Sequence, residues 1–590
     1  MLPAMWEGPA AYASRLTLSD LPCDVRLRDN RPKFRTAESM SALKNILITG
    51  GRVVDPDSGI DQLADVAIAG DRIVDGSAES FVPEKVIDAS GCVVMAGGID
   101  LHTHIGGGKV SLARMLMADH RSVDKFLPTA SQTADLYLNM GYTTCFEPAV
   151  IPCNARSAHA EMAAVTGIDT GGYCLLGNDE VLLEMIGSNQ PPELINDYVA
   201  WMVRATRSIA VKVVNPGGIS AFKYGVRNFD LDTPHPKYGC TAAKVIEVLC
   251  RSVSEIGLVH PLHVHCSNLG VPGNIDTTLA TIRAANGLPI HLTHAQFHCY
   301  AKGDQDHESA MVSGAAQLAD AIRRHPNVTI DVGQIMFGQT VTISADTMHQ
   351  HDHFRHAKPR KSVLVDVECE AGCGVVPFRY RKRQFVHSLQ WAIGLELFLM
   401  IDDPSRVFLT TDHPNGAPFT SYPHLIRLLG DRSFRETALA EINSEAQSSC
   451  SLGGIDREYS LSEIATMTRS APAKILGLSD RGHLSHGAIA DVVIYPDGKN
   501  LDAMFATPDY VIKGGNVVRD PTGSTIPDNP IPSSTLAANV SFDPTSVQKL
   551  ESRYESRSTF AMQRLWISDD EMRNVLGSEV VATDIKERQR

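Results

Sequence analysis

Short apolar runs alternate with longer stretches of helical periodicity through most of the chain. Strands of a parallel sheet are buried on both faces, so they are expected to be almost continuously apolar. Eight runs have this character: Val93–His104, Tyr142–Glu147, Tyr173–Leu176, Ile209–Val214, Pro261–Cys266, Ile290–His294, Val328–Val332 and Val407–Thr411. Their alternation with helices predicts an α/β fold with a closed (β/α)8 barrel. An open doubly wound sheet is the alternative, but no Gly-x-Gly-x-x-Gly follows any of these runs.

Shorter strands in hairpin-like patterns precede and follow the predicted barrel. Residues 45–97 contain such strands around Gly-Gly and Gly-Asp turns, and residues 477–521 return to the same pattern. We expect both segments to build one small β-sandwich, with the barrel of residues 98–476 inserted between them. Residues 1–44 are interpreted as an N-terminal extension. Residues 522–590 are interpreted as a C-terminal tail, either disordered or a docking arm, with a helix-like stretch at Thr545–Tyr554.

A long insert, at about residues 333–405, separates the last two predicted strands. Phe385–Leu399 has the apolar spacing of a buried helix, whereas His349–Lys361 is rich in His, Arg and Lys. Inserts of this length form lids or substrate walls in some barrels and solvated loops in others, and the sequence leaves both open. After the barrel, Leu461–Leu476 is expected to be a helix that ends at Gly477.

The net negative charge of the chain argues against nucleic acid and acidic membranes as partners. The 590 residues contain 68 acidic and 54 basic side chains, for a formal net charge of −14. A negative protein is a poor general ligand for nucleic acid or an acidic membrane, because both need a positive field. No apolar run is long enough to span a bilayer, and the first forty residues lack the pattern of a secretory signal. We therefore expect a cytoplasmic protein that binds neither nucleic acid nor membrane.

Candidate chemistry begins at the end of the first predicted strand. His102 and His104 are two residues apart, so on a strand both side chains point to one face and can bind one metal ion. Gly97 and Gly98 allow the chain to bend just before them. A lone His-x-His also occurs as two structural histidines, so the interpretation depends on what ends the other strands.

Four further ligand-type residues end later strands: Lys212, His265, His294 and Asp412. Catalytic groups of such barrels sit at these C-terminal ends. A buried ammonium is costly unless it is paired or neutralised. Lys212 is therefore interpreted as a carbamate formed with CO₂, which can bridge two cations, while an ion pair with an acid is the alternative. His263 has the right residue type, but we interpret it as a supporting residue.

These residues predict a binuclear zinc site, since imidazole and carboxylate ligands suit that ion. His102, His104 and Asp412 would hold one ion, His265 and His294 the other, and carboxylated Lys212 would bridge them. Two such ions lower the pKa of a water and polarise a carbonyl. With Asp412 passing the proton to the leaving amine, the site predicts hydrolysis of an amide or related C–N bond.

These residues, in this order, resemble the amidohydrolase superfamily. Longer motifs resemble one family within it: the A subunit of formylmethanofuran dehydrogenase and its bacterial counterpart, the hydrolase subunit of the formyltransferase/hydrolase complex. The motifs are His102-Thr-His-Ile105, Val211-Lys-Val-Val-Asn-Pro-Gly-Gly218, His263-Val-His-Cys-Ser-Asn-Leu-Gly270, Thr293-His-Ala-Gln-Phe-His298, Ile330-Asp-Val-Gly-Gln334, Gly374-Val-Val-Pro-Phe378, Gln390-Trp-Ala-Ile-Gly-Leu-Glu-Leu397, Leu409-Thr-Thr-Asp-His-Pro-Asn415, Pro418-Phe-Thr-Ser-Tyr-Pro423 and Ile455-Asp-Arg-Glu-Tyr459.

The resemblance implies a dinuclear zinc centre with a carboxylated lysine, placed on Lys212 rather than Lys223. It implies hydrolysis of N-formylmethanofuran, or a related furan-type C1 carrier, to formate and the free amine. It also implies that the chain works with the other subunits of a formyltransferase/hydrolase complex in one-carbon metabolism, the dehydrogenase complex being the alternative. A cyclic-amide hydrolase of the dihydropyrimidinase type and a non-catalytic scaffold protein remain as rivals.

Three residues near the strand ends, Asn268, His298 and Gln334, are candidates for contact with the formyl group or with the carrier. Each is equally well interpreted as a residue that supports a metal ligand.

Overall fold

The computed structural model describes residues 45–117, 125–226, 228–303, 311–344, 365–367, 373–522 and 533–586. The predicted extension at residues 1–44 and the basic segment at residues 349–361 lie outside these ranges. Within them, no helix combines the length and the apolar character needed to cross a bilayer.

The described residues contain a barrel of parallel strands that follow one another around the barrel in chain order. They are β6 (Gly98–Asp100), β7 (Tyr142–Val150), β8 (Asp169–Leu175), β9 (Ala210–Val214), β10 (Leu262–His265), β11 (Ile290–Leu292), β14 (Val328–Asp331) and β18 (Val407–Phe408). The barrel closes where Thr103 forms a parallel bridge with His413, and the His104 N–H donates to the His413 carbonyl at 2.8 Å. The predicted (β/α)8 barrel is confirmed.

The first predicted strand, Val93–His104, is two strands instead of one. Its first half is β5 (Cys92–Ala96), which belongs to the small sheet, and its second half is β6 of the barrel. The break falls at Gly97, where an added Cβ would lie 2.2 Å from Thr143 Oγ1, so only glycine fits against β7. The two histidines follow β6 and flank the residue that closes the barrel.

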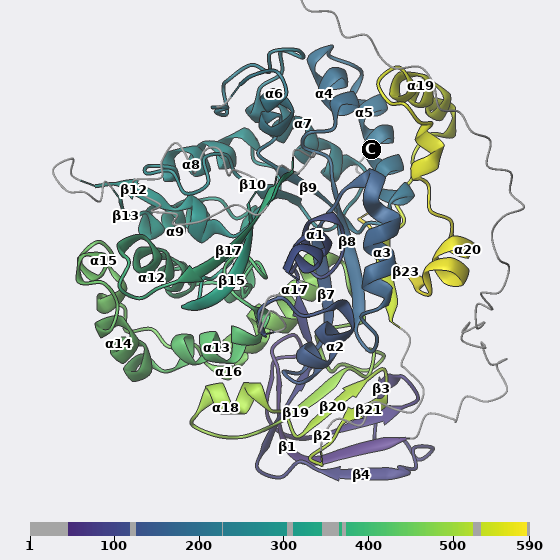
Figure 1. Cartoon of the computed structure of the whole chain (residues 1–590). Coiled ribbons are helices and arrows are strands. Elements are labelled where there is room, and N and C mark those ends of the chain that lie inside the picture. The colour runs from purple at the N-terminus through teal and green to yellow at the C-terminus, as the bar shows by residue number, and fades with distance from the viewer. Residues whose placement is uncertain are drawn as a thin grey trace, which may run out of the picture. The chain divides into compact units, whose positions relative to one another are not determined.

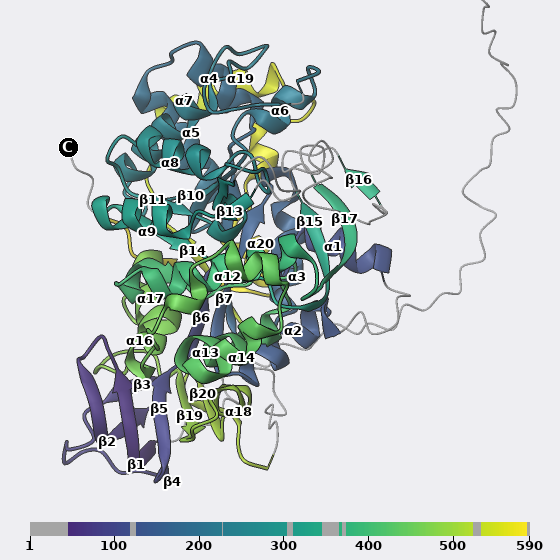
Figure 2. The ribbon, with the colours of Figure 1, turned by 90° about the vertical axis from the view of Figure 1, so that its left-hand side faces the viewer.

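Helices cover the outside of the barrel, as both views show (Figures 1 and 2). Among them are α5 (Pro192–Ala205), α7 (Ala242–Glu255), α9 (Ala315–Arg324) and α12 (Phe385–Met400). The apolar spacing that predicted a buried helix at Phe385–Leu399 is confirmed by α12, which is buried along most of its length. The insert before it forms a three-stranded antiparallel sheet of β15 (Gly338–Ser344), β16 (Val365–Val367) and β17 (Cys373–Tyr380). Both interpretations of this insert, a lid or substrate wall and a solvated loop, stay predictions.

The helix predicted after the barrel is also present. It comprises α16 (Leu461–Ala465), one π-helical turn and α17 (Ala471–Leu476). Ser460 and Glu463 form a capping box at its start, in which each side chain accepts from the other's backbone N–H. Gly477 ends it with a φ of +70°, which glycine adopts without strain.

The two flanking segments share one small sheet. Strand β1 (Ile46–Asp55) pairs with β2 (Ile60–Ala69), β4 (Lys85–Asp88) and β5, and β5 pairs in turn with β19 (Val492–Pro496) from the other segment. Figure 1 shows the purple and the yellow-green strands side by side. The expected small sandwich is one eight-stranded sheet, and Arg72 at one end of it forms an isolated bridge with Ile489, in the segment before β19.

The C-terminal tail differs from expectation. In the described residues 533–586 it is folded, with β22 (Ser534–Ala538) paired to the start of β8 and β23 (Glu579–Thr583) paired to β22. The Ala538 N–H donates to the Ser208 carbonyl just before β9, so β22 lies between β8 and β9 at the N-terminal end of the barrel. Leu536 is fully buried there. The expectation of a disordered segment is wrong for these residues, and the alternative, a docking arm for a partner, stays a prediction.

Candidate metal centre

The strand ends place His102, His104 and Asp412 in one group, although they come from opposite ends of the barrel sequence. Asp412 Oδ1 lies 3.1 Å from His102 Nε2 and 3.5 Å from His104 Nε2. At 3.1 Å, His102 Nε2 still has no hydrogen bond of normal geometry. Atoms that are close but not aimed at one another are expected of ligands that point at a common ion.

A second group contains three histidines, His265, His294 and His298. The His265 ring centroid lies 4.5 Å from that of His294 and 5.0 Å from that of His298, and the last two rings stack at 5.2 Å. All three are buried. Nδ1 of His294 and both ring nitrogens of His298 have no hydrogen bond of normal geometry within the described residues. Sequence reasoning placed His298 among the substrate contacts, whereas the structure places it among candidate metal ligands.

Lys212 is buried in the middle of the barrel interior, at 2% exposure. It lies on β9 opposite His263 of β10 and Leu175 of β8. Burial and the Lys212 ammonium both lower the pKa of His102, while Asp331 and Asp412 raise it and prevail. That Lys212 shares the site with the first group stays a prediction. Its carboxylation stays a prediction.

Asp412 is buried and ionised. Burial alone would raise the pKa of Asp412, but His102, His104 and His294 hold it well below the ordinary value. The Asn415 side chain donates to its Oδ1 at 3.0 Å. An ionised carboxylate that already has a donor is suited both to metal binding and to accepting a proton.

Two buried carboxylates that the sequence analysis missed hold the histidines of the first group. Asp331, at the end of β14, lies 3.1 Å from His102 Nδ1, and Glu147, on β7, lies 2.8 Å from His104 Nδ1. With Nδ1 protonated toward these acids, each ring presents Nε2 to an ion. A carboxylate that ends an otherwise apolar strand was the signal that could have identified both.

Four of the seven non-glycine residues with positive φ in the described chain follow barrel strands. Asn215, Asn268, His294 and Asp412 have φ values of +40°, +66°, +34° and +49°, a region that residues other than glycine rarely adopt. Each follows a barrel strand, β9, β10, β11 and β18 respectively. Strained backbone of this kind persists where the surrounding structure fixes it and is concentrated at functional sites.

The other two predicted substrate contacts belong to neither group of candidate metal ligands. The Gln334 amide donates to the Trp391 carbonyl on α12 at 3.1 Å, and a Cβ at Gly394 would meet its Oε1 at 2.0 Å. The side chain therefore packs against α12. Asn268 is half-buried and donates to Asp230 and to Thr277 at 3.1 Å. The observed contacts of both residues are with neighbouring loops and helices.

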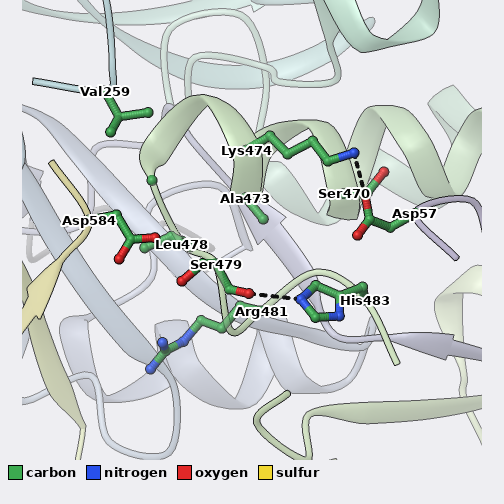
Figure 3. Close-up of a pocket in the computed structure, with 11 residues that line it drawn as sticks. Asp57, Val259, Ser470, Ala473, Lys474, Leu478, Ser479, Arg481, His483 and Asp584 are labelled. Carbon is green, nitrogen blue, oxygen red and sulfur yellow. Dashed lines mark hydrogen bonds and ion pairs between the residues drawn. The ribbon is translucent and has the colours of Figure 1, made fainter. Parts of the chain in front are cut away.

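A cavity of about 350 Å³ lies at the opposite end of the barrel (Figure 3). Lys474 and Asp57 form an ion pair across it, and His483 Nε2 donates to the Ser479 carbonyl at 3.0 Å. Arg481, which also lines it, pairs with Asp480 at 2.6 Å and with Asp169 at 3.1 Å. None of the candidate metal groups found in the described residues includes a residue that lines it.

The donor set fits zinc, because it offers neutral imidazoles and carboxylates in two groups with unpartnered buried nitrogens. Burial, followed by His265, lowers the pKa of His298 far below its ordinary value, with a smaller opposing effect of Asp412 and the Ser267 carbonyl. Burial and His265 do the same to the pKa of His294. Both rings are therefore neutral, which is the form that binds a metal.

Comparison with known proteins gives one family and close relatives. A model described as "Amidohydrolase family" matches residues 85–519. The A subunit of the formyltransferase/hydrolase complex Fhc of Methylorubrum extorquens is 46% identical over 485 residues, which cover 80% of this chain and 87% of that one. Protein FwdA of Methanocaldococcus jannaschii is 37% identical over 520 residues, covering 81% of this chain and 90% of that one.

A solved structure is similar over most of the chain. It is the crystal structure of the formyltransferase/hydrolase complex FhcABCD from Methylorubrum extorquens in complex with methylofuran. The matched chain superposes with a TM-score of 0.85 at 41% identity, covering 92% of this chain and 100% of that one.

Proposed function

Because the chain belongs to the amidohydrolase family, we propose that it hydrolyses the formamide N-formylmethanofuran, or a related furan-type C1 carrier, to formate and the free amine. The observation that carries this proposal is the meeting of His102, His104 and Asp412 in one buried group, with His265 and His294 in a second. Such ligand sets at the C-terminal ends of barrel strands are typical of metal-dependent hydrolysis.

In this proposal His102, His104 and Asp412 hold one zinc ion, and His265 and His294 hold the other. Lys212, as a carbamate, bridges them; this accounts for a lysine at 2% exposure in a site rich in histidine. Two zinc ions in these positions would supply Lewis acidity toward the formamide carbonyl and acidify a water.

The chain's own contribution is proton transfer and orientation. Asp412 accepts a proton from the attacking water and delivers it to the amine nitrogen as the C–N bond breaks, so that the neutral amine and formic acid leave, and the acid then ionises to formate. Its low pKa keeps it ionised at neutral pH, so it carries no proton of its own before the reaction. Asn415 holds its carboxylate from one side, and Asp331 and Glu147 keep the histidine rings turned toward the ions.

We further propose that the chain is the A subunit of a formyltransferase/hydrolase complex, a cytoplasmic assembly of one-carbon metabolism. The support is its likeness to one chain of the complex that was crystallised with methylofuran. The alternative, the A subunit of a formylmethanofuran dehydrogenase, is supported by a lower identity, 37% against 46%. Asn268 stays a proposed contact for the carrier, and Gln334 is more consistent with a support of α12.

The experiment is a substrate comparison on the chain purified together with its natural partners. Formate release is measured with N-formylmethanofuran-type formamides and with hydantoins, alongside zinc content per chain. We expect formate release, no hydantoin opening and two zinc ions per chain. Hydantoin activity alone would indicate a cyclic-amide hydrolase, and less than one zinc per chain without turnover would indicate a scaffold. A formyltransferase among the co-purified proteins supports the hydrolase complex, and a metal-pterin protein overturns that assignment.

A further inference from the structure

We propose that His298 is a third imidazole ligand of the second metal site, which the proposed function assigns only to His265 and His294. The inference rests on the proposed metal centre and goes beyond it, because it changes the ligand set and makes the two ions inequivalent. It replaces the interpretation of His298 as a substrate contact.

The first observation is three unpartnered nitrogens in one place. His298 is fully buried, and neither of its ring nitrogens has a hydrogen bond of normal geometry within the described residues; Nδ1 of His294 shares this property. A buried polar atom without a hydrogen bond destabilises the fold, so native proteins rarely leave several together. An ion between the rings would take a lone pair from each. The Ser267 carbonyl beside His298 remains for its N–H.

The second observation is proximity to the two assigned ligands. The donor atoms of His265, His294 and His298 all lie within 4.8 Å of one another. His298 stacks on His294 with an interplanar angle of 29° and meets the edge of His265 at 74°. Three imidazoles converging from two chain segments form one face of a tetrahedral zinc site, with the fourth position left for a bridging or incoming group.

The third observation is that the backbone around His298 is fixed by the protein. His298 ends the 3₁₀ turn Ala295–His298, and Thr278 Oγ1 donates to its carbonyl at 2.7 Å. Asn274 Nδ2 donates to the preceding carbonyl, that of Phe297, at 2.9 Å. A side chain on such a clamped turn is held in place before any substrate arrives, as metal ligands are.

The proposal makes the two sites chemically different. The first holds its ion with two imidazoles and the Asp412 carboxylate, and the second with three neutral imidazoles. Three imidazoles then hold the second ion independently of the carbamate on Lys212. We therefore expect the second site to retain zinc when Lys212 is replaced, and to lose it when His298 is also replaced.

The test is zinc binding by the purified holoprotein, measured by chelator competition for His298→Ala, His298→Gln, Lys212→Ala and Lys212→Ala/His298→Ala. His159→Ala is the matched control, since His159 is equally buried and its Nε2 bonds only to the Thr206 carbonyl at 2.8 Å among the bonds found. We expect either His298 variant to weaken one of two zinc equivalents by more than the roughly 10–100-fold typical of an outer-shell partner. The control should keep both equivalents at wild-type affinity.

Folded His298 variants that bind both equivalents like the wild type, with only a raised KM, would overturn the proposal and restore the substrate contact. If the variants do not fold, a crystal structure of the zinc-loaded wild type decides. A His298 nitrogen at about 2.0–2.1 Å from an ion supports the proposal, and one beyond hydrogen-bonding distance overturns it. Failure of the proposed function is distinguishable, because the wild type itself would then bind fewer than two ions.

Discussion

The barrel buries ionisable groups at both of its ends, and their surroundings differ. At the N-terminal end, Asp169 pairs with Lys513 at 2.6 Å and with Arg481 at 3.1 Å, and it accepts the N–H of Ser534 at 3.1 Å. Lys513 pairs also with Asp491 at 2.9 Å. Burial alone would raise the pKa of Asp169, but Lys513 and Arg481 hold it below the ordinary value. Every buried charge here has a partner of opposite sign.

At the C-terminal end, equally buried groups are left incomplete. His102 Nε2, His294 Nδ1 and the His298 ring lack hydrogen bonds of normal geometry, and the backbone of His294 and Asp412 is strained. These are the atoms that the proposed ions would engage. Buried groups thus serve two purposes. At the N-terminal end, which we call the completed end, paired charges join the small sheet, the barrel and the tail. At the C-terminal end, which we call the incomplete end, we expect the unpaired groups to bind ions.

The largest expected effect is on catalysis at the incomplete end. Asp412→Asn keeps the size and one oxygen of the side chain but removes its ability to accept a proton. We expect turnover to fall by about 10²–10⁴-fold, the usual contribution of a general base. Zinc content and the denaturation midpoint should stay close to wild type, because no completed ion pair is broken.

The measurement is steady-state formate release together with metal analysis and chemical denaturation. Wild-type turnover in Asp412→Asn would remove this residue from the proton-transfer role. If Asp412→Asn lost much of its stability but little of its turnover, the two ends of the barrel would not differ in the way proposed.

The opposite result is expected at the completed end. Lys513→Met leaves Asp169 and Asp491 with one cation fewer in a buried setting, and removing one member of a buried pair typically costs about 3–5 kcal/mol. The free energy of unfolding should fall by this amount, while the turnover of the protein that remains folded changes little. Denaturant unfolding at neutral pH measures it.

The pH dependence of that loss has a definite sign. Because the pKa of Asp169 is lowered in the fold, its contribution is present above the ordinary carboxyl pKa and is lost as the pH falls through the lowered value. The stability gap between wild type and Lys513→Met should therefore narrow in acid. A gap that stays constant down to strongly acidic pH would show that packing, not charge, accounts for the loss.

The sequence was most informative at the strand ends. Four candidate metal ligands each end an apolar run: His102, His265, His294 and Asp412. Because the carboxyl ends of parallel strands meet at one edge, the sequence predicted that these side chains lie together. The barrel followed from the same alternation. These features depend on local pattern and on a general rule of topology, so they need no knowledge of distant contacts.

What the sequence did not predict depends on contacts between distant segments. The break at Gly97 exists because Thr143 lies against it, and Leu536 joins the barrel although it lies far along the chain from β8. Gln334 turns toward α12 because Gly394 leaves room there. Asp331 was missed because it acts through histidines instead of as a ligand, and its place in an apolar run was the only sign of it in the sequence.

The smallest of the expected effects tests how the incomplete end is supported. Asp331 accepts from four donors: His102 Nδ1 at 3.1 Å, His291 Nε2 at 3.1 Å, the His294 N–H at 2.8 Å and Thr410 Oγ1 at 3.0 Å. Asp331→Asn replaces one of its oxygens by a donor that faces other donors, so the His102 ring loses its fixed orientation.

We expect zinc affinity in Asp331→Asn to fall by roughly 10–100-fold, as for other partners of metal-binding histidines. Chelator competition measures this, and excess zinc should restore most of the turnover, because Asp412 is intact. Unchanged zinc affinity would mean that the ions themselves orient His102. The order of the C-terminal end of the barrel would then depend on bound zinc and not on Asp331. Lost turnover that excess zinc does not restore would instead give Asp331 a part in the reaction itself.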